Sequence, residues 1–127
     1  MPLPSFQNPA AYYLPLPDLE PQNYNSPALT NQIVLATPGR LFGFTATSTD
    51  AAAQFILLFD EEGLPADGAV PVLALNASAT SAAAAYWGTA GRWFNRGVVI
   101  CNSTTQGSKT IGAADTLFDV QFTPQVV

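Results

Sequence analysis

Four carboxylates in one short, turn-rich stretch are the residues of this chain best suited to catalysis or metal binding. Asp60, Glu61 and Glu62 directly follow an apolar run, and Asp67 comes shortly after them. Two facing carboxylates can hydrolyse a glycoside, and several together can hold Ca²⁺ through hard oxygen ligands. Their spacing matches no known metal loop, and carboxylates in a loop between strands are usually solvated. We therefore expect neither a metal site nor a catalytic pair here.

Other catalytic equipment is missing from the sequence. Histidine is absent, so a Ser-His-Asp or Cys-His nucleophile cannot be built from this chain alone. The stretch Gly107-Ser108-Lys109-Thr110 resembles only the end of a phosphate-binding loop and fits a β-turn instead. The single cysteine, Cys101, excludes an internal disulfide, and its apolar neighbours predict a buried side chain. We predict that the chain is not an enzyme and binds no cofactor.

The charge balance also limits the partners. The chain has four basic and nine acidic residues, with a net charge of −5, and the basic residues are scattered. Nucleic acid and anionic membranes attract clustered Lys and Arg, so we expect binding to neither. The chain shows no signal-peptide pattern and no apolar run long enough to span a bilayer, which predicts a soluble compartment. Asn76 and Asn102 begin N-glycosylation patterns, which we interpret as chance matches without an export signal.

The elements that position these residues are organised around the run from Gln54 to Asp60. Five successive large apolar residues fit a β-strand that is buried on both faces. We expect Phe55, Leu57 and Phe59 to fill one face, and Ile56 and Leu58 to stand on the other. A strand in a two-layer protein normally has one solvated face, so the second face needs a cover. Either the N-terminal arm of this chain or a neighbouring subunit would supply it.

The rest of the chain from residue 29 indicates an all-β domain. Strands are predicted at 32–37, 40–48, 54–59, 70–76, 97–103 and 116–123, and the segment 77–85 is either a small-residue strand or a loop. The strands at 40–48 and 116–123 alternate, so each has one solvated face. Seven or eight short strands separated by turns predict a jelly-roll-like β-sandwich spanning residues 29–127.

Residues 1–28 differ from the sandwich in composition. They hold seven of the eleven prolines, which rule out a continuous helix or a central strand. They are also rich in large apolar residues, which a free linker does not need. We interpret them as an extended arm that reaches a neighbouring surface or wraps back over its own sheet; its large apolar residues are Leu3, Phe6, Tyr12, Tyr13, Leu14, Leu16, Leu19 and Tyr24.

A second group of apolar residues is the aromatic cluster Tyr86, Trp87, Trp93 and Phe94, which surrounds a Gly-Arg turn. Such a cluster can form a platform on which sugars stack. More often, aromatic residues this close together cap a sandwich core or fill an interface. We favour the second interpretation.

Three stretches resemble small structural proteins of tailed bacteriophages. They are the run from Ala53 to Asp60 with its continuation Gly63–Pro71, the segment Gly91–Ile100, and Ser103-Thr104-Thr105. The resemblance covers roughly Gly39 to Phe122 as a pattern of apolar runs and turns without catalytic residues. It implies a jelly-roll capsid decoration (cement) protein that sits on the outer face of the virion head after synthesis in the host cytoplasm. Its partner would be the major capsid protein.

The resemblance also implies a homo-oligomer, with a trimer as first choice and a dimer as second. We expect oligomer or capsid contacts from the apolar arm, the second face of the buried strand and the two tryptophans: Leu3, Phe6, Tyr12, Tyr13, Leu14, Leu16, Tyr24, Ile56, Leu58, Trp87 and Trp93. One alternative is a receptor-binding domain of a phage tail fibre that recognises a host glycan. Another is a free carbohydrate-binding module or a small glycosidase-like enzyme.

Overall fold

A computed structural model describes residues 22–49, 54–77 and 82–124 of the chain. These segments form nine β-strands and no helix, so none of the described residues belongs to a helix that could cross a membrane. The strands are β1 (Gln22–Leu29), β2 (Asn31–Leu35), β3 (Gly39–Ser48), β4 (Gln54–Phe59), β5 (Leu73–Ala77), β6 (Ala82–Tyr86), β7 (Arg92–Phe94), β8 (Val98–Ser103) and β9 (Thr116–Pro124).

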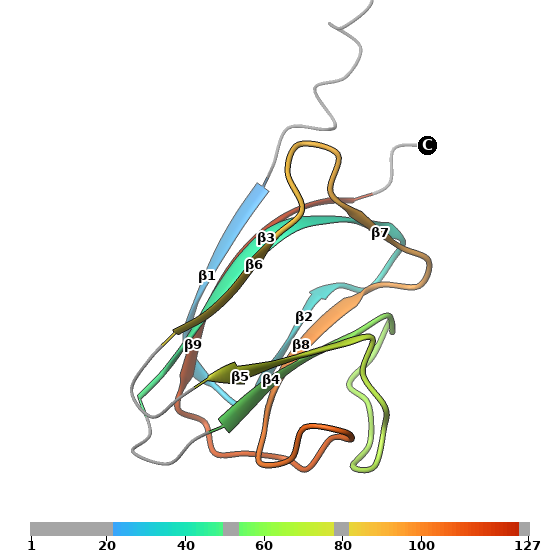
Figure 1. Cartoon of the computed structure of the whole chain (residues 1–127). Helices are drawn as coiled ribbons and strands as arrows, with labels where there is room; N and C mark the ends of the chain where they lie inside the picture. Colours follow the sequence, from blue (N-terminus) through green and yellow to red (C-terminus); the bar gives the residue numbers. More distant parts are fainter. Residues whose placement is uncertain (1–21, 50–53, 78–81, 125–127) are drawn as a thin grey trace, which may run out of the picture.

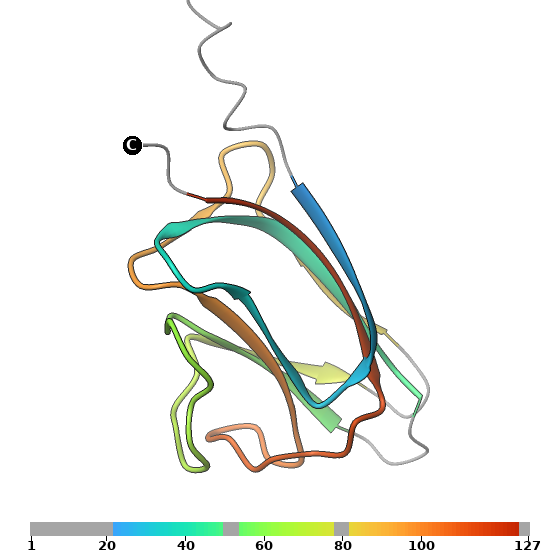
Figure 2. The same ribbon diagram turned by 180° about the vertical axis from the view of Figure 1, so that it is seen from behind.

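The strands form two antiparallel sheets in a sandwich-like arrangement (Figure 1). The larger sheet has the order β1-β9-β3-β6, with β7 pairing on the same edge of β3 as β6. The smaller sheet has the order β2-β8-β4-β5. In both views the larger sheet arches over the smaller one (Figures 1 and 2). The prediction of an all-β sandwich is confirmed at this level.

Buried and exposed side chains alternate along β9, one of the long strands of the larger sheet. In β9, Phe118 and Val120 are buried, whereas Leu117 and Gln121 are exposed. Phe118 and Val120 lie opposite Ala46 and Phe44 of β3, so four apolar side chains meet on the inner face of the sheet. The alternation predicted for β9 is therefore confirmed. In β3 a register shift between Leu41 and Gly43 interrupts the predicted alternation, so that Leu41 enters the core together with Phe44.

The core lies between the two sheets and has three fully buried phenylalanines among its largest side chains: Phe44, Phe94 and Phe118. The smaller sheet contributes Ile56, Leu58, Val98 and Ile100 to the same cluster. Ile56 and Leu58 are each only 1% exposed. The expectation that these two residues face a partner is therefore wrong, because they point into the chain's own core.

The opposite face of β4 is also buried, although it lies outside the sandwich. Leu57 and Phe59 form a second cluster with Val99 and Cys101 of β8, and Leu57 has an exposed fraction of 0%. The sequence correctly predicted a strand buried on both faces, but it assigned the core to the wrong face. Both faces are equally apolar, so the pattern alone could not distinguish them.

Two loops of the same chain accompany this second cluster. The first spans 60–72 and contributes Ala69 to the cluster, and the second spans 104–115. They are joined by backbone hydrogen bonds from Gly68 N to Lys109 O and from Lys109 N to Ala69 O, each 2.8 Å long. The paired loops lie together at the end of the smaller sheet (Figure 2). Leu57 and Phe59 are therefore buried within a single chain, without a second subunit.

The boundary of the predicted arm changes as well. Residues 22–28 were expected in the arm, but they belong to β1, which pairs along β9 from Gln22↔Phe122 to Leu29↔Thr116. The register shifts between Asn25 and Ala28, where Pro27 lies. An edge strand with a bulge is a position in a sheet that tolerates proline. The sequence did not predict β1 as a strand because its proline argued against one.

Candidate functional site

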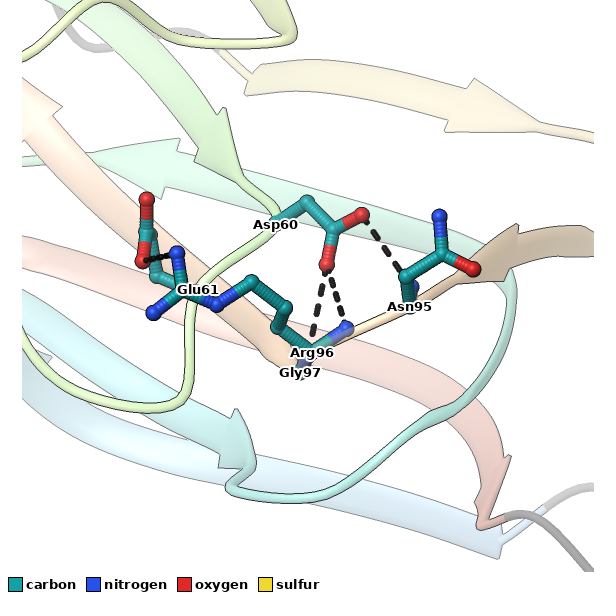
Figure 3. Close-up of polar contacts among 5 residues, drawn as sticks. All are labelled: Asp60, Glu61, Asn95, Arg96 and Gly97. Atoms are coloured by element: carbon teal, nitrogen blue, oxygen red, sulfur yellow. Dashed lines mark hydrogen bonds and ion pairs between the residues drawn. The ribbon is translucent and has the colours of Figure 1, made fainter.

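Asp60, the first residue of the acidic cluster, has a structural role. Its carboxylate accepts hydrogen bonds from the backbone N–H groups of Asn95 (3.1 Å), Arg96 (2.8 Å) and Gly97 (3.3 Å), as Figure 3 shows. Partial burial would raise its pKa, but these three donors, with the Arg96 charge, lower the pKa below its ordinary value. The side chain therefore ties the end of β4 to the turn between β7 and β8 as a carboxylate.

The other three acidic residues of the cluster point to separate partners. Glu61 forms an ion pair with Arg96 at 3.0 Å, and both side chains are largely solvated. Asp67 accepts a hydrogen bond from Ile111 N at 3.1 Å, and Glu62 is exposed. Within the described segments, no group of three or more His, Cys, Asp or Glu side chains converges on a point that could hold a metal ion.

Cys101 and Lys109 lie close together under the paired loops. Cys101 is fully buried, and burial raises the pKa of its thiol to about 11, with a small opposing effect from the Lys109 charge. Lys109 as a residue is 5% exposed, and its ammonium donates a hydrogen bond to Pro65 O at 2.6 Å. A thiol with a raised pKa is a poor nucleophile, so Cys101 acts as an apolar member of the second cluster.

Asn102, one of the two glycosylation candidates, is inaccessible. Its side chain is 0% exposed, and its amide nitrogen donates to Ala113 O, Asp115 Oδ1 and Thr116 Oγ1 at 3.0, 2.7 and 2.8 Å. These contacts fix the loop that precedes β9 against β8. A glycan cannot be attached to Asn102 in the folded domain, whereas Asn76 on β5 is exposed.

The aromatic residues do not form one stacking platform. Phe94 is buried, and Trp87 is half-buried against the core with its ring 6.3 Å from that of Phe44. Trp93 is 40% exposed, lies under the Arg40 guanidinium at 5.6 Å and donates from Nε1 to Asn95 Oδ1 at 2.7 Å. Of the predicted contact residues, only Trp93 therefore offers a substantial exposed ring within the described part of the chain.

The remaining predicted contact residues divide by position. Tyr24 lies on β1, half-buried, and its hydroxyl donates to Gln32 Oε1 at 3.2 Å, which links the two sheets at one edge. The apolar residues Leu3, Phe6, Tyr12, Tyr13, Leu14 and Leu16 lie outside the described residues. The structure thus brings Trp87 and Trp93 to one end of the larger sheet and places Ile56 and Leu58 in the core.

The outer face of the larger sheet is a broad surface that the sequence did not single out. Side chains of β9, β3 and β6 lie across it in rows, such as Gln121–Gly43–Tyr86 and Asp119–Thr45–Ala84. Two shallow depressions lie on this face; the larger, about 270 Å³, is lined by residues of β1, β3 and β9 including Asn25, Thr45, Leu117 and Asp119. The rows carry few charged side chains, and the cores of protein interfaces are likewise depleted in charge.

The edge of β6 is the second surface that the sequence left undefined, because its alanines fit a strand or a loop. Tyr86 ends this strand with its side chain 65% exposed; its ring packs over Gly43, and its hydroxyl lies 3.2 Å from Thr45 Oγ1. A Cβ at position 43 would lie 2.1 Å from the Tyr86 ring, so the glycine permits this contact. Among the described strands β6 therefore combines an edge without a partner with one large exposed ring.

Compared with known protein families, with curated proteins and with solved structures, the chain matches none of them.

Proposed function

We propose that this chain is a virion structural protein, a jelly-roll capsid decoration (cement) protein that binds the outer surface of a phage head. The nested order of strand pairs carries the proposal. β1 pairs with β9, β2 with β8, β3 with β6 and β4 with β5, so the chain is arranged as one long hairpin rolled into two sheets. Jelly rolls of this kind recur in viral capsid and lectin domains.

The surface supports assembly over catalysis. The four acidic candidates have separate structural or solvated roles, and the broad outer face of the larger sheet is almost uncharged. Because Ile56 and Leu58 are internal, contact with the major capsid protein is assigned to this outer face, to Trp93 beside it and to the N-terminal arm. The homotrimer is the first-choice state and the homodimer the second.

Cementing follows from linkage. A ligand that binds the assembled shell, but not its separated subunits, stabilises the shell by its binding free energy. Copies repeated by icosahedral symmetry add this effect at every site, and contacts made by both a domain and an arm of one chain reinforce each other. Modest affinity per copy is therefore sufficient to strengthen the particle.

The test uses virions purified from the source that encodes this chain. Quantitative mass spectrometry is expected to find hundreds of copies per particle, and antibody labelling is expected to mark the outer head surface. Adding the full chain to particles that lack it should raise the temperature at which they release DNA. A few copies per particle, located at the tail, would contradict the proposal, and so would an unchanged release temperature.

A tail-fibre domain that recognises a host glycan is the second candidate, and one observation favours it. A small depression on the outer face is lined by Thr45, Tyr86, Asp119 and Gln121, which combine an exposed ring with polar side chains. Sugar recognition uses this combination of stacking and hydrogen bonds. A glycan array separates the candidates: binding lost in Tyr86→Ala but kept in Trp93→Ala would favour the tail domain.

A further inference from the structure

Within residues 22–49, 54–77 and 82–124, nothing pairs with the outer edge of β6, and the strand has no Lys, Pro or bulge of the kind that protects many edge strands. Among the described residues, β6 pairs only with β3, and the register of that pairing has no shift. Natural sheets protect their edges with Lys, Pro or bulges. β6 consists of four alanines and Tyr86 and has none of these, whereas β1 at the opposite edge carries Pro27 and a bulge. Only one edge of this sheet is protected.

The ladder shows which backbone groups of β6 point outward. Trp87 N donates to Phe42 O at 2.9 Å, and these two residues form the next pair after Gly43↔Tyr86. Hydrogen-bonded pairs alternate in an antiparallel ladder, so Ala83 and Ala85 bond to β3. The N–H and C=O groups of the intervening residues then face away from β3; these are Ala82, Ala84 and Tyr86, the three exposed residues of the strand.

We propose that residues 10–14 of a second copy of this chain add to this edge as an antiparallel strand. The inference deepens the proposed function, on which it rests, by naming the contact between copies. Twenty-one residues precede β1, with prolines at positions 2, 4, 9, 15, 17 and 21. Their longest proline-free run is Ala10-Ala11-Tyr12-Tyr13-Leu14, which matches the five residues of β6 in length.

The composition of this run suits the edge. Every residue keeps its N–H donor, none is charged, and tyrosine is a favourable strand residue. The β6 edge presents alanine, which leaves room beside it for Tyr12, Tyr13 and Leu14. Directly opposed side chains on one face of an antiparallel pair lie close enough to contact each other, so Tyr12 would pack against the alanines of β6. Main-chain hydrogen bonds would supply affinity, and the tyrosines would select the register.

Geometry favours a second copy over the chain's own arm. An added strand would lie four strand spacings from β1, about 19 Å. Antiparallel pairing would place Leu14 opposite Ala82, five residue rows from Gln22, which is a shift of about 17 Å along the sheet. The straight distance is then about 25 Å, and the eight residue steps from Leu14 to Gln22 reach no more than about 25 Å as polyproline II. The arm would have to cross the arched outer face almost taut and bring Asp18 and Glu20 over Asp119.

The test measures the mass of the full chain by analytical ultracentrifugation over a range of concentrations, in the absence of any shell. We expect concentration-dependent association, with slow hydrogen exchange at the amides of Ala82, Ala84 and Tyr86 in the associated form. The substitution Ala84→Pro should abolish association. It removes no β3 hydrogen bond because the Ala84 N–H faces outward, and thermal unfolding checks that the domain still folds.

A matched pair of variants in the N-terminal arm gives a second test. These substitutions leave the sequence of the β-sandwich unchanged. Adjacent N–H groups of a strand point in opposite directions, so Tyr12→Pro/Tyr13→Pro removes a pairing donor in either register. This double variant should lose association. The control Gln7→Pro/Asn8→Pro adds the same two prolines outside the run and should associate like the unmodified chain.

Mixing distinguishes the source of the strand. Ala84→Pro supplies an intact arm and the Tyr12→Pro/Tyr13→Pro chain supplies an intact edge, so their mixture should form complexes with one copy of each. Protected β6 amides at monomer mass would overturn the second copy in favour of the chain's own arm. A monomer with unprotected amides at all concentrations, or association unaffected by the variants, would overturn the strand addition itself. None of these results depends on binding to a viral shell.

Discussion

The ammonium of Lys109 donates a hydrogen bond to the backbone carbonyl of Pro65 at 2.6 Å, across 44 positions of sequence. This contact joins the loops 60–72 and 104–115, which pair beside the cluster formed by Leu57, Phe59, Val99 and Cys101. The cluster lies outside the sandwich, on the face of the smaller sheet that would otherwise meet water. The chain thus buries its most apolar strand with its own loops.

The first prediction concerns this contact. Lys109→Ala should lower the free energy of unfolding by about 1–3 kcal/mol, because it removes a charged donor and leaves the Pro65 carbonyl without it. Loosened loops should also expose the Cys101 thiol, so thiol labelling should accelerate under native conditions. Gln106→Ala in the same loop is the control, since Gln106 is exposed. Equal labelling rates in the two variants would show that Lys109 does not hold the loops.

The second prediction tests whether the loops or another subunit bury the outer side of β4. Leu57→Ala should cost about 2–5 kcal/mol, as expected for a large core side chain, and this cost should not change with protein concentration. Ile56→Ala, in the core between the sheets, serves as the comparison. Urea denaturation at several protein concentrations measures both. If the cost of Leu57→Ala appeared only at high concentration, a partner would be covering this face.

The sequence predicted some strands well for identifiable reasons. β9 alternates, and β3 alternates from Phe44 onward, so these inward and outward residues follow from period two. The bulge after Leu41 in β3 does not. β4 and β8 are apolar runs too short for helices. β1 was missed because Pro27 argues against a strand, and only the bulge opposite β9 accommodates it. The assignment of faces in β4 was wrong because local pattern does not record which layer lies on which side.

The candidate site was predictable only in part. The acidic cluster was located correctly, but the role of Asp60 depends on backbone N–H groups 35 to 37 positions away, and a backbone group has no sequence signature. The β6 edge was also beyond sequence reasoning, since alanines fit several structures equally well. Both the Asp60 contacts and the β6 edge therefore depend on strand pairing between residues far apart in sequence. This pairing determines which backbone N–H and C=O groups have hydrogen-bond partners and which do not.

A third prediction addresses the buried amide of Asn102. Asn102→Asp would place a carboxylate against Ala113 O and the Asp115 carboxylate, where the amide nitrogen now donates. We expect a loss of about 3 kcal/mol or more at neutral pH. The new carboxyl should have a raised pKa in the folded state, so its destabilisation should shrink as pH falls. Asn76→Asp on the exposed β5 position is the control, and equal urea midpoints at neutral pH would contradict the prediction.

The last prediction follows from the lowered pKa of Asp60. A carboxyl whose folded pKa lies below its unfolded value contributes stability above the unfolded pKa, and this contribution disappears as pH falls through the folded pKa. Asp60→Asn should therefore destabilise the protein at pH 7 by about 1–3 kcal/mol, through the loss of charge-assisted hydrogen bonds to Asn95, Arg96 and Gly97. The difference from the unmodified protein should narrow once the pH falls below the ordinary carboxyl pKa of 3.8. Urea unfolding from pH 7 to pH 2 measures this trend, with Glu62→Gln as the exposed control that should stay near zero throughout. A constant difference across that range would mean that the negative charge of Asp60 does not hold the turn between β7 and β8.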